Sequence, residues 1–217
     1  MKRWKKILLW LICAPIVLLS AVSALLYSNT RPTTGPQIGK YAAPRTALIV
    51  IDIQEDYTGP QAKKRYRDGD RIVAASNALL EQARLQGVPV VFIENVIENP
   101  LIALFFGGVN APGAPGTATD RRLQKVPGAR TFTKNRADAF SNPELDAFLH
   151  QNRVNHVLIT GLDAAYCVNA TTKGALNRDY KVTLFPEGIA TESGKSMDKL
   201  TKEWREAGAE VKAGVGM

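Results

Sequence analysis

Strand-like and helix-like segments alternate along most of this chain, and this alternation restricts its fold more than any other feature. Short apolar runs cover residues 46–52, 88–94, 129–134, 154–161 and 181–187. Helical patterns lie over residues 70–87 and 142–152, from residue 167 onward, and over 193–208. This order predicts an α/β fold in which helices cover both faces of a central parallel sheet. We expect a three-layer α/β/α Rossmann-like domain with about six strands.

The N-terminal region differs from the rest. Residues 7–27 are uncharged and about as long as the hydrocarbon core of a bilayer, and the four positive charges of residues 1–6 indicate a cytoplasmic flank. We therefore expect an N-terminal transmembrane helix, with the membrane as a partner and the folded domain outside the cytoplasm, periplasmic or extracellular. Small residues at 21–24 favour the alternative of a cleaved signal peptide and a secreted domain. Residues 28–45 predict a linker, and 46–217 the domain.

Charge and cysteine content exclude some classes of function. The net charge is +8, but half of it lies in the basic flank, and no basic stripe is interleaved with aromatic residues. Nucleic acid is therefore not an expected partner. Cys13 lies in the apolar run, so the domain has one cysteine, Cys167, and cannot form an internal disulfide.

Three chemically active side chains are predicted at strand ends. Asp52 ends the first strand, Lys134 ends the third, and Cys167 follows the fourth, where a helix begins. In open parallel sheets the functional crevice lies at the carboxyl ends of the strands. A helix N-terminus and an ammonium group both lower the pKa of a thiol, and a carboxylate can act as its base. Cys167 alone is more typical of core packing, but the three together predict a nucleophilic site.

The sequence segments around these residues resemble the motifs of a known protein family. "ALIVIDIQEDY" (47–57), "KNRADAF" (134–140) and "GLDAAYCVNATTKGAL" (161–176) occur in this order. They resemble the three motifs of the isochorismatase-like cysteine hydrolases, a superfamily that includes nicotinamidases and N-carbamoylsarcosine amidases. The resemblance extends over residues 45–212.

The resemblance implies a mechanism. Cys167 attacks the carbonyl carbon of a small amide or ureide, Asp52 acts as general base and then acid, and Lys134 holds the thiolate and orients Asp52. The C–N bond breaks, and water hydrolyses the resulting thioester. The backbone N–H groups of Asp163 and Cys167 form the oxyanion hole beside a non-proline cis peptide, for which Leu162–Asp163 is the candidate. Gln54, Tyr57, Phe140 and Tyr166 are candidate pocket residues, and a homo-oligomer is implied.

Two departures from the family pattern affect these expectations. The histidines of the metal-dependent relatives are missing, since His150 falls in a helix and His156 opens a strand. We therefore expect no catalytic metal and no cofactor. Asp163 stands where relatives have small neutral residues, and a carboxylate near a developing oxyanion is unfavourable. It either recognises a cationic substrate group or forms hydrogen bonds within the turn, and we favour the second interpretation.

Two other functions remain open. An isochorismatase-type enzyme hydrolyses a vinyl ether by acid catalysis without a cysteine, and the intact Cys167 argues against it. A non-catalytic, membrane-tethered binding module could retain the site for packing alone. The presence of Asp52, Lys134 and Cys167 together argues against that alternative.

Overall fold

The computed structural model describes residues 2–216, which form one six-stranded parallel sheet with helices on both faces. The terminal methionines, included in the predicted segments 1–6 and 46–217, lie outside the described residues. The strands are β1 (Arg45–Ile51), β2 (Val90–Asn95), β3 (Arg130–Lys134), β4 (Val154–Gly161), β5 (Lys181–Ile189) and β6 (Glu210–Val211). Their order is β3-β2-β1-β4-β5-β6, so the direction of winding reverses between β1 and β4. The predicted three-layer architecture is confirmed.

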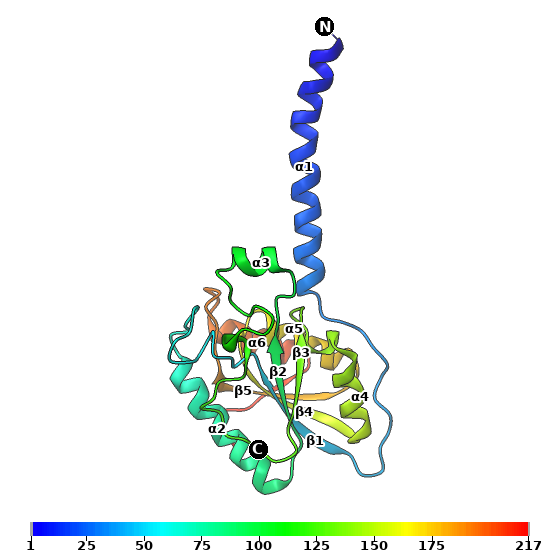
Figure 1. Cartoon of the computed structure of the whole chain (residues 1–217). Coiled ribbons are helices and arrows are strands. Elements are labelled where there is room, and N and C mark those ends of the chain that lie inside the picture. The colour runs from blue at the N-terminus through cyan, green and yellow to red at the C-terminus, as the bar shows by residue number, and fades with distance from the viewer. Residues whose placement is uncertain (1, 217) are drawn as a thin grey trace.

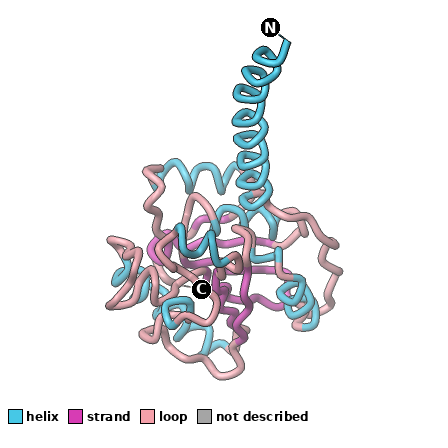
Figure 2. The backbone as a smooth tube through the Cα atoms, turned by 45° about the horizontal axis from the view of Figure 1, so that its top comes forward, coloured by secondary structure: helices cyan, strands magenta, loops and turns pink. Residues whose placement is uncertain are grey.

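The helices divide unequally between the two faces of the sheet (Figures 1 and 2). They are α1 (Lys2–Thr30), α2 (Gly69–Gln86), α3 (Pro100–Phe105), α4 (Pro143–Gln151), α5 (Cys167–Leu176) and α6 (Met197–Glu206), with 3-10 turns η1 (Pro115–Thr117) and η2 (Ala139–Ser141). Apolar side chains of α2 form the core on one face, and those of α4, α5 and α6 form the core on the other.

The side chains of strand β1 are buried on both faces of the sheet. Ile49 and Ile51 pack into the core shared with α4, α5 and α6, whereas Leu48 and Val50 pack against α2. Successive side chains of a strand point to opposite faces, so a strand covered on both sides must be apolar throughout. The uninterrupted apolar run at 47–51 therefore reflects burial on both faces rather than an amphipathic edge.

The predicted transmembrane helix is not supported. Residues of the apolar run do lie in one long helix, α1, which projects away from the sheet (Figure 1). Within residues 2–216, however, no helix combines the length and the apolar character that crossing a bilayer requires. The predictions of a membrane anchor over 7–27 and of a membrane-anchored domain outside the cytoplasm are therefore wrong. They rested on the length of the uncharged apolar run and on the positive charges that precede it.

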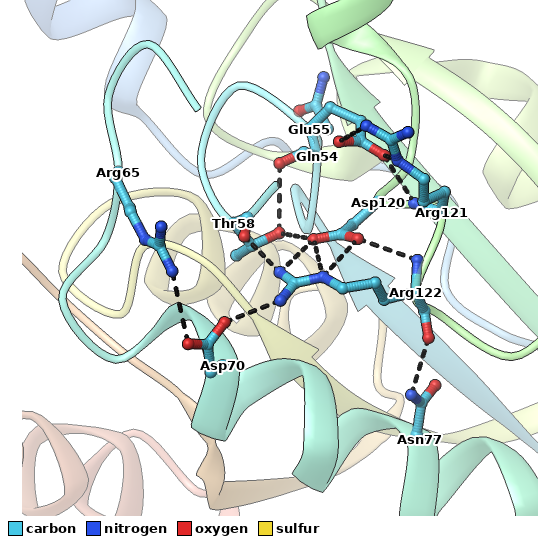
Figure 3. Close-up of polar contacts among 9 residues, drawn as sticks. All are labelled: Gln54, Glu55, Thr58, Arg65, Asp70, Asn77, Asp120, Arg121 and Arg122. Atoms are coloured by element: carbon cyan, nitrogen blue, oxygen red, sulfur yellow. Dashed lines mark hydrogen bonds and ion pairs between the residues drawn. The ribbon is translucent and has the colours of Figure 1, made fainter. Parts of the chain in front are cut away.

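Residues 96–129 leave the sheet between β2 and β3, and a polar network fixes the end of this excursion (Figure 3). Asp120 is buried and accepts hydrogen bonds from Thr58 Oγ1 at 2.6 Å and from Arg122 Nη2 at 2.7 Å. Arg122 also donates to Asp70 at the start of α2, at 2.7 Å. The network therefore ties the excursion to the loop after β1 and to α2.

Candidate active site

The structure brings the three predicted residues together at the carboxyl ends of the strands. Lys134, the last residue of β3, donates from Nζ to Asp52 Oδ2 at 2.8 Å and to Cys167 Sγ at 3.2 Å. Asp52 follows β1 directly, and Cys167 is the first residue of α5, which follows β4. The side chains of Lys134 and Asp52 are almost fully buried, whereas Cys167 is half-buried.

The backbone at Asp52 turns the carboxylate into the site. Its φ of 54° lies in the left-handed region, which is uncommon for a residue other than glycine. Its N–H still donates to Ile93 O of β2 at 2.9 Å, so the turn starts while the residue remains attached to the sheet. Asp52 Oδ1 is buried and has no hydrogen-bond partner among the described residues. This oxygen is therefore available to accept a proton.

Burial dominates the electrostatics of the site. Desolvation raises the pKa of the Asp52 carboxyl, and the Lys134 ammonium only partly opposes this effect. Desolvation also opposes the charge on Lys134, but the neighbouring Asp52 and Cys167 raise its pKa overall, so it stays protonated. Loss of hydration raises the pKa of the Cys167 thiol to about 12, because the lowering effect of Lys134 is offset by the negative charge of Asp52.

This direction differs from the lowered thiol pKa that the helix N-terminus and the ammonium had suggested. One positive and one negative charge flank the sulfur, so their effects on the thiol pKa largely cancel. Desolvation then determines the direction of the pKa shift. Burial therefore favours the neutral form of the thiol, while Lys134 beside it stays protonated. Such a thiol needs a base to become nucleophilic.

The turn before Cys167 contains the expected cis peptide bond, at Leu162–Asp163. Gly161 precedes it with φ 127°, and a Cβ atom at this position would lie 2.0 Å from Ile51 O. This close approach of β4 to β1 explains why the third motif begins with glycine. In the described part of the chain, the backbone N–H groups of Asp163 and Cys167 have no acceptor.

The Asp163 side chain is part of the turn itself. Its Oδ1 accepts hydrogen bonds from Ala165 N and Thr191 Oγ1, both at 2.8 Å. Its Oδ2 accepts from Glu192 N at 2.9 Å and from Tyr66 Oη at 3.1 Å. With both oxygens engaged, the carboxylate links the turn to residues 191–192, which agrees with the interpretation that it forms hydrogen bonds within the turn.

The four predicted pocket residues lie in different environments. Gln54 is fully buried, and its Nε2 donates to the carbonyl oxygens of Asn95 and Thr117. Phe140 is also buried, and the Arg178 guanidinium lies 4.7 Å from its ring centre. Tyr57 is partly buried, and Tyr166 is 53% exposed. Gln54 and Phe140 are thus buried, whereas the two tyrosines are more accessible.

Two asparagines and a tyrosine complete the surroundings of the site and were not predicted. Asn95 ends β2, and its Oδ1 lies 3.4 Å from Lys134 Nζ. Asn110, on the excursion, is buried and donates from Nδ2 to Tyr57 Oη at 2.7 Å. Tyr66 stacks edge-on against Tyr57, with ring centres 5.7 Å apart. The strand-end rule used for Asp52 would have found Asn95, but no sequence signal identifies the other two.

The histidines lie away from these groups. His150 Nδ1, in α4, is 3.3 Å from Tyr41 Oη, and His156 Nε2, in β4, is 2.8 Å from Thr183 Oγ1. Across the described residues, no three His, Cys, Asp or Glu side chains are arranged to hold a metal ion.

Comparisons with known proteins agree with this arrangement. Residues 46–213 match the family model described as Isochorismatase domain. N-carbamoylsarcosine amidase from Arthrobacter sp. is 28% identical over 156 residues, or 67% of this chain and 59% of that protein. Streptothricin hydrolase from Streptomyces noursei is 30% identical over 148 residues, or 68% of this chain and 55% of that protein. The chain thus spans less than two thirds of the length of these two relatives.

The fold is also found among solved structures. The crystal structure of N-carbamoylsarcosine amidase from Thermoplasma acidophilum gives a TM-score of 0.69 and is 23% identical, with 78% of this chain and 96% of that chain covered. At this level of identity the likeness shows a common fold.

Proposed function

Because this chain belongs to the isochorismatase family, we propose that it is a cysteine-dependent hydrolase that cleaves a C–N bond in a small amide or ureide. The observation that carries the proposal is the contact of one buried ammonium, Lys134 Nζ, with both Asp52 and Cys167. The names of the relatives, an amidase and a hydrolase, support the class of reaction.

In the first half of the reaction, the Cys167 thiol loses its proton to Asp52 as sulfur attacks the carbonyl carbon. The free Oδ1 of Asp52 is the acceptor, while Oδ2 stays bonded to Lys134. The raised pKa of Asp52 suits this role, because a carboxyl with a higher pKa accepts and holds a proton more readily. Lys134 stabilises the charge on sulfur as it develops.

Collapse of the tetrahedral intermediate breaks the C–N bond. Asp52 returns its proton to the leaving nitrogen, so ammonia or an amine departs and the acyl group remains on Cys167 as a thioester. The N–H groups of Asp163 and Cys167, which lack acceptors in the described part of the chain, are the donors for the oxyanion. Asp52 then takes a proton from water, the hydroxide attacks the thioester, and the proton returns to the departing sulfur.

The test is ammonia release by the full-length chain from a panel of small amides and ureides. Cys167→Ala and Asp52→Asn should each abolish release from any substrate that the wild-type chain hydrolyses. Cys13→Ala is the matched control, because it removes the only other cysteine, in α1, and should leave the rate unchanged. Hydrolysis that survives in Cys167→Ala would contradict the proposed function.

A further inference from the structure

The segment between α1 and the domain, residues 31–38, belongs to the predicted linker over 28–45 and lies against the domain edge. Thr33 donates from both its backbone N and its Oγ1 to Asp138 Oδ2, each at 2.7 Å. Ile38 N donates to Arg178 O at 2.9 Å, and the Ile38 side chain packs against the core. We call residues 31–38 the N-terminal strap.

The partner of the strap, Asp138, lies four residues beyond Lys134 and is fully buried. Its Oδ1 accepts a hydrogen bond from Phe140 N at 2.9 Å, which fixes turn η2 after β3. Ala137 N donates to Asn29 O at the end of α1, at 3.0 Å. The loop that leaves Lys134 is therefore bonded to residues on both sides of the junction between α1 and the strap.

Asp138 also contacts the helix that begins at Cys167. A Cβ atom on Gly174 of α5 would lie 2.3 Å from Asp138 Oδ2, so only glycine allows this approach. Next to it, Ala139 N donates to Thr171 Oγ1 of α5 at 3.0 Å. Asp138, in the loop that follows Lys134, thus contacts the helix that begins at Cys167.

Arg178 strengthens the same junction from the other end of α5. Its guanidinium donates to Thr33 O at 3.2 Å, to Thr34 O at 3.3 Å and to Gly174 O at 3.0 Å. It also donates to Asp146 of α4 at 2.9 Å. One buried cation therefore joins the strap to two helices on the face of the sheet where Cys167 lies.

We propose that the N-terminal strap is a positioning element for the active site, and that the bond from Thr33 to Asp138 sets the distance between Lys134 and Cys167. This proposal rests on the proposed function. Without the Thr33 hydroxyl, Asp138 Oδ2 keeps only the backbone donor, and the loop after β3 is held less firmly beside α5. Lys134 Nζ would then draw back from Cys167 Sγ, which it contacts at 3.2 Å.

The test is Thr33→Val in the full-length chain, which removes the hydroxyl and keeps the shape of the side chain. We expect kcat to fall about tenfold, with KM changed by less than about twofold, because positioning acts on the chemical step. Alkylation of Cys167 by iodoacetamide at pH 9 should slow by a similar factor, because the ammonium that favours the thiolate has moved away. Thr33→Ser restores the hydroxyl and should restore both rates.

Thr34→Val is the matched control, since it places the same change one residue further along the strap, where only the backbone oxygen is bonded. It should leave both rates unchanged. Wild-type kcat and alkylation in a folded Thr33→Val chain, or equal losses in Thr34→Val, would overturn the proposal. If Thr33→Val fails to fold, a rate loss in Thr33→Ser would overturn it, because that variant keeps the hydroxyl. The alkylation readout needs no substrate, and Cys167→Ala tests the proposed function separately.

Discussion

Replacing Lys134 by methionine removes the only positive charge that contacts Asp52 and Cys167 in the described residues. At 2.8 Å, the attraction between Lys134 Nζ and Asp52 Oδ2 is about 6 kcal/mol at an effective dielectric constant of about 20, and desolvation offsets much of it. The variant leaves a buried carboxylate without a partner, so we expect it to lose about 3–5 kcal/mol of unfolding free energy at pH 7.

The loss of unfolding free energy in Lys134→Met should depend on pH. Burial already raises the pKa of Asp52, and removal of Lys134 raises it further. A carboxyl whose pKa is higher in the folded state binds more protons when folded, so the stability of the variant falls as pH rises above about 4. The deficit relative to the wild-type chain should therefore be smallest at low pH and should grow as pH rises.

The double variant Lys134→Met, Asp52→Asn is the matched control. It removes both charges, so its unfolding free energy should return to within about 1 kcal/mol of the wild-type value. Neither variant should release ammonia, because one lacks the cation and the other lacks both the cation and the base. Stability is measured by urea unfolding at pH 4.5 and pH 7. A wild-type urea midpoint for Lys134→Met at pH 7, or an equal deficit in the double variant, would refute the reasoning.

Three further predictions concern the nucleophile and its turn. Asp163→Ala removes a carboxylate that accepts four hydrogen bonds. We expect the free energy of unfolding to fall by about 3 kcal/mol and the melting temperature to fall by about 6–12 °C in thermal unfolding. An unchanged melting temperature would count against the role of this network. Gly161→Ala places a Cβ atom 2.0 Å from Ile51 O. We therefore expect circular dichroism spectra to show little folded protein. A native spectrum would argue against the close approach of β4 to β1. Burial raises the pKa of Cys167 to about 12. The rate of its alkylation should therefore rise about tenfold per pH unit between pH 7 and pH 10. A plateau below pH 8 would mean that the resting thiol is already ionised.

The sequence was sufficient to place the groups of the site because strand ends are visible in it. The carboxyl edge of a parallel sheet can be located without any knowledge of contacts. It is marked by the apolar runs that end in Asp52 and Lys134 and by the helix that begins at Cys167. The two-residue strand β6 was missed, because Glu210–Val211 is too short to show a periodic pattern. It pairs with β5 at Thr183 and Leu184, and Val211 packs against the core.

The pKa of Cys167 and the course of the strap could not be predicted for a different reason. The thiol pKa depends on how closely two opposite charges approach one sulfur and on how much water is excluded, and neither quantity is encoded locally. The strap has the Pro, Gly and Thr content of a linker, yet Thr33 finds a buried acceptor 105 residues away. A tertiary hydrogen bond of this kind leaves no trace in local composition.

The most direct test of the central claim is mass spectrometry of the full-length chain, quenched in acid during turnover of a hydrolysed amide. We predict an acyl adduct on the peptide that contains Cys167, with the mass of the substrate minus its amine leaving group, and no adduct on Cys13. The adduct should be absent from Cys167→Ala, which should also be inactive. Full turnover with no adduct at Cys167, together with an active Cys167→Ala chain, would contradict the account.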